Sequence, residues 1–147
     1  MQVQFFFTDI KITLKQRTKL KEFIELIFSI EKKSLSSINY IFCSDEYLLN
    51  INRQYLRHNY YTDIITFNLS ESNEVIEGEV YISVDRVKDN SQSLKHAVNI
   101  ELHRVIFHGI LHLCGYLDKS KTEIIEMRSK EEKYLNMYFR FKVPRGT

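Results

Sequence analysis

AVNIELHRVIFHGILHLC, residues 97–114, is a long and markedly apolar stretch that predicts a buried helix. Gly115 follows it directly and predicts the end of that helix, because glycine readily adopts the left-handed conformation that commonly closes a helix. A helix that is apolar on most sides has to be covered by other elements. We therefore expect the rest of the chain to fold around residues 97–114.

Outward from this helix, β-rich runs alternate with amphipathic ones. We expect strands over residues 3–8, 38–44, 63–69 and 79–84, and helices over residues 14–33, 46–56, 85–95, 97–114 and 121–139. The last two strands flank the polar turn SESNE and should form a hairpin. This order predicts one α+β domain over residues 1–147, in which a small mixed four-stranded sheet packs with about five helices.

The composition suits a soluble protein with its own core. The chain has 147 residues, 44% of them hydrophobic, a size that can bury a core without disulfides. Cys43 and Cys114 are too few for a disulfide framework and form no CxxC pair, which favours a reducing compartment. No signal-peptide pattern is present, and no run reaches the ~20 apolar residues of a membrane span. We expect a cytoplasmic protein.

Charge is distributed unevenly along the chain. Lys and Arg number 7 against 4 Asp and Glu in residues 1–33, 6 against 11 in residues 34–118, and 8 against 4 in residues 119–147, which end in the basic tail RFKVPRGT. Basic ends around an acidic centre are compatible with a polyanionic partner. Ordinary solvated helix faces explain the same pattern equally well.

The central helix carries a predicted metal site. His108 and His112 are four residues apart, so on a helix they lie about 40° apart and point the same way. A turn at Gly115 would let Asp118 bring a carboxylate oxygen to the same point. Two imidazoles and one carboxylate leave a coordination position open, which is typical of catalytic rather than structural zinc. Zinc would lower the pKa of a bound water to ~7.

Paired histidines on an apolar helix could also be satisfied core residues. Gly109 favours the metal site, since a glycine inside a helix costs ~1 kcal/mol relative to alanine. Its place beside His108 suggests that something approaches the backbone closely there.

The pattern HxxxHxxGxxD resembles the zinc-binding stretch of the metzincin peptidases, which have a glutamate general base after the first histidine. Gly109 occupies that position here. Without the carboxylate, a peptidase would lack the group that activates water and carries its proton to the leaving amine. The chemistry therefore disfavours proteolysis.

Residues 108–118, HGILHLCGYLD, more closely resemble the HGxLHLxGYDH hallmark of the YbeY family, bacterial endoribonucleases that act as rRNA maturation factors. Leu117 stands where the family has Asp, and Asp118 stands where it has the third His. Three further segments resemble family motifs in the same order: LLNINRQY at 48–55 resembles LNxxYR, TDIITF at 62–67 resembles TDVLSF, and GEVYIS at 78–83 resembles GDIxIS.

The resemblance implies a metal-dependent, single-strand-specific endoribonuclease that acts in rRNA maturation and ribosome quality control. It implies a zincin-like central helix and one Zn²⁺ per chain held by His108, His112 and Asp118, although nickel or another divalent ion could take the site. The expected partners are single-stranded RNA, rRNA and the ribosome, with no DNA and no membrane.

The family's YR segment carries an arginine that contacts the RNA backbone, and the matching position here is Leu56. Arg53, Arg57 and His58 are the candidates to replace it, and each could equally be an ordinary surface residue. Asp63 is a candidate catalytic residue that handles protons or orients a ligand; it could equally cap a turn.

Glu101 and three tyrosines each allow two roles. Glu101 lies on nearly the same helix face as His108 and could orient it, or could pair with Arg104 three residues later. Tyr55, Tyr60 and Tyr61 could stack on bases or serve in packing. Besides an endoribonuclease, the sequence allows a metzincin-like zinc peptidase, or a non-catalytic ribosome-associated factor with a bound metal.

Overall fold

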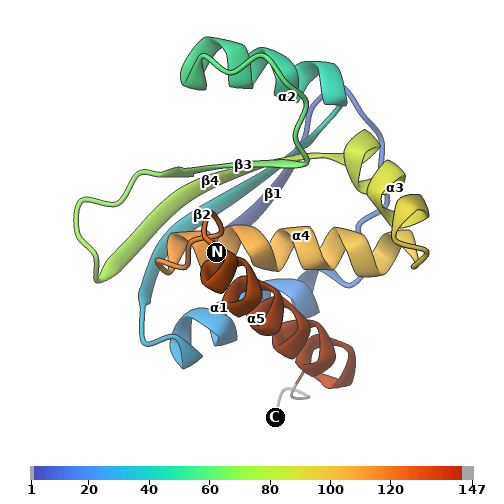
Figure 1. Cartoon of the computed structure of the whole chain (residues 1–147). Helices are drawn as coiled ribbons and strands as arrows, with labels where there is room; N and C mark the ends of the chain where they lie inside the picture. The colour runs from blue at the N-terminus through green and yellow to red at the C-terminus, as the bar shows by residue number, and fades with distance from the viewer. Residues whose placement is uncertain (1, 144–147) are drawn as a thin grey trace.

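The computed structural model describes residues 2–143, so residues 144–147 of the predicted basic tail lie outside the described part. In chain order the elements are β1 (Val3–Phe7), α1 (Arg17–Ile30), β2 (Ser34–Cys43), α2 (Asp45–Ile51), the π-helical turn η1 (Asn52–Leu56), β3 (Ile64–Asn68), β4 (Val75–Ser83), α3 (Val84–Ser93), α4 (Val98–Leu113) and α5 (Lys121–Arg140). Figure 1 shows how they are arranged.

The four strands form one mixed sheet in the order β1-β2-β4-β3. β2 runs parallel to both β1 and β4, and Tyr40 is paired with Phe5 on one side and Val80 on the other. β3 runs antiparallel to β4, with Thr66 opposite Val80. The predicted α+β class, the mixed four-stranded sheet and the β3–β4 hairpin are confirmed.

Several predicted boundaries were wrong. β2 begins at Ser34 and β4 at Val75, each four residues before its predicted start, because the two strands go on pairing through the segments SLSS and VIEG, which mix polar residues and a glycine with apolar ones. The helix predicted over residues 14–33 is confined to Arg17–Ile30. The single helix predicted over residues 46–56 divides into α2 and the turn η1.

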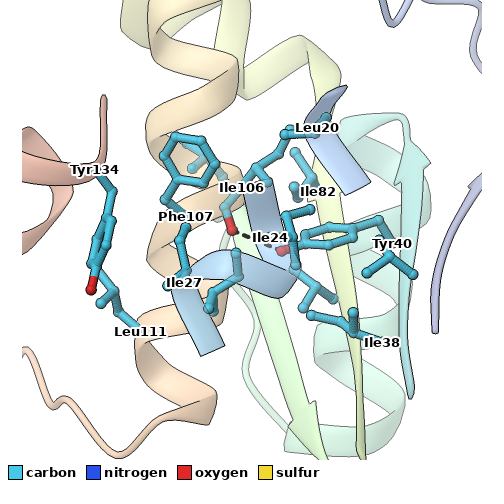
Figure 2. Close-up of a cluster of buried hydrophobic side chains, with 14 of the residues drawn as sticks. Leu20, Ile24, Ile27, Ile38, Tyr40, Ile82, Ile106, Phe107, Leu111 and Tyr134 are labelled. Carbon is cyan, nitrogen blue, oxygen red and sulfur yellow. Dashed lines mark hydrogen bonds between the residues drawn. The ribbon is translucent and has the colours of Figure 1, made fainter. Parts of the chain in front are cut away.

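The helices α4 and α1 pack side by side on the sheet, α4 against β3 and β4 and α1 against β1 and β2, and α5 covers α4 (Figure 1). Ile106, Phe107 and Leu111 are fully buried in the core cluster (Figure 2). The buried Tyr40 hydroxyl of β2 donates a hydrogen bond of 3.0 Å to the Ile106 carbonyl, which fixes α4 on the sheet. The prediction of a buried central helix is confirmed. In residues 2–143, no helix has the length and apolar character needed to cross a membrane.

At Gly109, α4 packs closely against the sheet. A Cβ atom added there would lie 2.9 Å from Val80 Cγ1 and 3.1 Å from Ile64 Cδ1. The prediction that something approaches this backbone is confirmed, but the approaching groups are side chains of β3 and β4 and not a ligand. This packing places His108, the residue just before Gly109 on α4, beside the start of β3.

Candidate metal centre

Two turns of α4 and the loop after it bring three donor groups together. The rings of His108 and His112 lie at 82° to each other, with centroids 4.5 Å apart. Asp118 Oδ2 lies 3.3 Å from His108 Nε2 and 3.1 Å from His112 Nε2. The ligand atoms of the three residues all lie within 4.8 Å of one another, so this group could hold a metal ion.

The loop that delivers Asp118 depends on Gly115. This residue has φ +105°, as its place after the apolar helix predicted. Its N–H donates to the His112 carbonyl at 3.0 Å, and the Tyr116 N–H donates to the Leu111 carbonyl at 2.9 Å. These two bonds form a Schellman motif, which ends α4 and turns the chain back toward its own last turn. A side chain at position 115 would be strained in this conformation.

Each histidine is oriented through its other ring nitrogen. His112 Nδ1 lies 3.0 Å from the Tyr116 carbonyl, and His108 Nδ1 lies 2.5 Å from Glu131 Oε2. A carbonyl and a carboxylate accept hydrogen bonds, so both neutral rings carry their proton on Nδ1. The two Nε2 lone pairs then face Asp118, and this donor set fits a divalent ion.

Glu131 belongs to a buried ionic network behind the histidines. Its Oε1 accepts from Arg104 Nη1 at 3.1 Å, and Arg104 Nη2 donates to Glu101 Oε2 at 2.6 Å. Desolvation favours protonation of Glu101, but the hydrogen bonds and charge of Arg104 outweigh it and lower the pKa of that carboxyl. Glu101 therefore pairs with Arg104, one of its two predicted roles, and is linked to His108 through Arg104 and Glu131.

Sequence reasoning missed Glu131, which is 3% exposed. One signal was present: in α5 the residues Met127, Glu131, Tyr134 and Tyr138 recur at helical spacing and are all buried. A carboxylate in an otherwise apolar stripe has to find a partner inside the protein.

Asp63 lies directly before β3, beside the network. Its Oδ2 is 3.6 Å from Arg104 Nη2 and accepts a 3.4 Å hydrogen bond from Asn90 Nδ2. Burial raises the pKa of Asp63, although the positive charge of Arg104 opposes the shift. The side chain faces the same cleft as His108.

A cleft of about 550 Å³ opens over the three donor groups. Of the predicted RNA-binding residues, His58 lines this cleft. Leu56, at the position of the family arginine, also lines the cleft and is 40% exposed. Within the described chain, Arg53 and Arg57 do not line this cleft: Arg53 Nε donates to Asn59 Oδ1 at 2.6 Å, and Arg57 is exposed at the end of η1.

Two further exposed residues, Tyr60 and Lys119, line the cleft. Tyr60 is 55% exposed and stacks on His58, with ring centroids 5.2 Å apart. Lys119, which sequence reasoning missed, is exposed and lines the cleft directly after Asp118. Tyr55 lies away from this cleft, where its ring packs edge-on against Phe67.

Comparison with known proteins agrees with the motif. The model of the family described as "Endoribonuclease YbeY" matches residues 3–139. Relatives named endoribonuclease YbeY include that of Cytophaga hutchinsonii, 51% identical over 90% of this chain and 93% of its own, and that of Flavobacterium psychrophilum, 43% identical over 88% and 92%. A solution structure of a Thermotoga maritima protein superposes with a TM-score of 0.66 at 25% identity, covering 99% of both chains. The chain therefore belongs to the endoribonuclease YbeY family.

Proposed function

We propose that this chain is a metal-dependent endoribonuclease that cleaves single-stranded RNA, with one metal ion held by His108, His112 and Asp118. The observation that carries the proposal is the convergence of two Nε2 atoms and one carboxylate oxygen on one point beside an open cleft. Phosphodiester hydrolysis needs a group that stabilises negative charge on the phosphate and a source of hydroxide.

We propose Zn²⁺ as the ion, because two imidazoles and one carboxylate are typical ligands of catalytic zinc. Nickel or another divalent ion could take the same donors. When bound, the ion would act as a Lewis acid and lower the pKa of water. Asp118 adds a negative charge that a third histidine would not add, so a water there should be less acidic than at a three-histidine site.

The surrounding residues have separate roles in this proposal. Glu131 and the Tyr116 carbonyl hold the protons on the two Nδ1 atoms and so aim the Nε2 lone pairs. Arg104 fixes Glu131 from behind. Asp63 is the candidate for proton transfer, since its raised pKa brings the carboxyl closer to the range in which it can hold and release a proton.

The proposal also covers the role of the chain in the cell. We propose that the natural substrate is ribosomal RNA, and that the chain acts as a single domain in the cytoplasm, in contact with the ribosome, in rRNA maturation and quality control. The family resemblance and the basic terminal segments support this role.

The activity can be tested with pure untagged protein and a fluorescently labelled single-stranded oligoribonucleotide, alone and after treatment with a chelator. We expect cleavage that stops on chelation, returns with Zn²⁺, and fails in His108→Ala. Casein and a duplex of the same sequence are the control substrates. Metal-dependent proteolysis without RNA cleavage would overturn the proposal in favour of a peptidase.

A non-catalytic role makes a different prediction in cells. If the chain were only a ribosome-associated factor, His108→Ala would restore rRNA maturation in cells that lack the native protein. The proposed function predicts that this variant fails while the wild-type chain succeeds, provided that immunoblotting shows equal amounts of both.

A further inference from the structure

Two clefts meet at the metal centre. The first, the β3 cleft, is the one of about 550 Å³ described above. The second, the α5 cleft, has a volume of about 230 Å³ and includes Met127 and Arg128 of α5. His108 and Asp118 line both clefts, so open space extends from the candidate metal ligands in two directions.

Among the described residues, each cleft offers one cation that is not held by an acid. Lys119 is the only lysine or arginine among the described residues that line the β3 cleft, whose acidic members are Asp63 and Asp118. In the α5 cleft Arg104 is bound by Glu101 and Glu131, which leaves Arg128. Within residues 2–143, neither Lys119 nor Arg128 forms an ion pair within 4.0 Å.

The backbone positions of both cations are fixed. Ser120 is the N-cap of α5 and forms a capping box with Glu123. Glu123 Oε1 also accepts from the Lys119 N–H at 3.3 Å, which anchors Lys119 beside Asp118. Arg128 follows the buried Met127 within α5. Two long, free, positively charged side chains therefore start from rigid positions on either side of the metal ligands.

We propose that a single strand of RNA lies across the metal centre from the β3 cleft to the α5 cleft, with Lys119 binding a backbone phosphate on one side and Arg128 binding one on the other. This proposal rests on the proposed function. Phosphate contacts of this kind position a strand without reading its sequence. Lys119 takes the role of a phosphate-binding cation in a cleft where Leu56 provides none.

The test uses three cleft variants, Lys119→Gln, Arg128→Gln and the double variant that carries both substitutions, and one control variant, Lys121→Gln. Lys121 is exposed, lies between the two cations in the sequence, and lines neither cleft, so its substitution controls for the loss of one positive charge. Binding of a labelled single-stranded oligoribonucleotide is measured by fluorescence anisotropy at increasing KCl on chelator-treated protein. KM and kcat are measured on metal-loaded protein. Thermal unfolding of each variant checks the fold.

We expect each single cleft variant to make the plot of log affinity against log salt less steep by ~0.7, the value for the loss of one phosphate contact to a single strand. The double variant should reduce the steepness by about twice as much. Between about 50 and about 200 mM KCl, the advantage of wild type over each single variant should then shrink about 2.6-fold. KM should rise while kcat stays within about twofold, because a phosphate contact remote from the reacting bond binds ground and transition states alike. Lys121→Gln should match wild type.

A rescue variant tests whether RNA binding depends on a positive charge in the β3 cleft. Leu56→Arg, made in the Lys119→Gln protein, places a cation in the same cleft and should restore much of the RNA affinity that Lys119→Gln loses. If wild type cleaves RNA but the cleft variants bind it no differently from Lys121→Gln, the strand path is wrong and the proposed function stands. If wild type neither binds nor cleaves RNA, the proposed function fails, and the strand path fails with it.

Discussion

Glu131→Gln should weaken metal binding without unfolding the protein. The substitution keeps the size of the side chain but removes the charge that His108 Nδ1 faces at 2.5 Å and Arg104 Nη1 faces at 3.1 Å. An amide can also present its NH₂ group to Nδ1, which would move the ring proton to Nε2 and block the metal lone pair. Partners that orient a ligand in this way typically contribute about 10- to 100-fold to metal affinity, or about 1.4 to 2.8 kcal/mol.

The assay is competition for Zn²⁺ between the protein and a chelating dye. Glu132→Gln is the matched control, because it removes the same charge from the next residue of α5, which is exposed. We expect Glu131→Gln to lose about 10- to 100-fold in affinity while Glu132→Gln keeps the wild-type value. Equal affinity in Glu131→Gln and wild type would refute the argument that Glu131 holds the His108 tautomer.

The helix packing, the ligand set and the acid stability can each be tested by one substitution. Gly109→Ala should lower the free energy of unfolding by about 1 kcal/mol, because the cost of overpacking against the sheet, about 1–3 kcal/mol, exceeds the ~1 kcal/mol gain in helix propensity. An unchanged midpoint of urea unfolding would contradict this. Asp118→His should retain metal and shift the rise of activity to lower pH, since it removes a negative charge beside the ion; a shift to higher pH would count against the assigned ligand. Desolvation raises the pKa of the Glu31 carboxyl, but hydrogen bonds from Tyr134 and Tyr116 outweigh it and lower this pKa below its ordinary value of 4.5. Wild type should therefore be more stable than Glu31→Gln above pH 4.5, and this advantage should be lost as the pH falls through the pKa that Glu31 has in the folded protein.

The parts of the site that depend on local chain geometry could be predicted from the sequence. The spacing of His108 and His112 places both rings on one helix face whatever the rest of the chain does. Gly115 predicted the left-handed turn, and the turn brought Asp118 to within 3.3 Å of both Nε2 atoms. The hairpin followed from a short-range pattern in the same way, and the mixed sheet was predicted from the order of the strands and helices along the chain.

The parts that depend on contacts between distant elements could not be predicted. Glu131 is 23 residues from His108 on another helix, and only the way α5 packs on α4 brings the two side chains together. Gly109 indicated a close approach, but the sequence could not show that the sheet and not a ligand fills the space. Arg53 lies outside the cleft in the π-helical turn η1, which no apolar pattern predicted.

The most direct test of the metal site is elemental analysis of untagged protein alongside its Asp118→Ala variant, after both are stripped with a chelator, reloaded with Zn²⁺ and desalted. We expect about one zinc per chain in wild type and a large loss in the variant, because two imidazoles alone make a weak site. Wild-type protein that retains no zinc, or a variant that retains as much as wild type, would contradict the assignment of His108, His112 and Asp118 as the ligands.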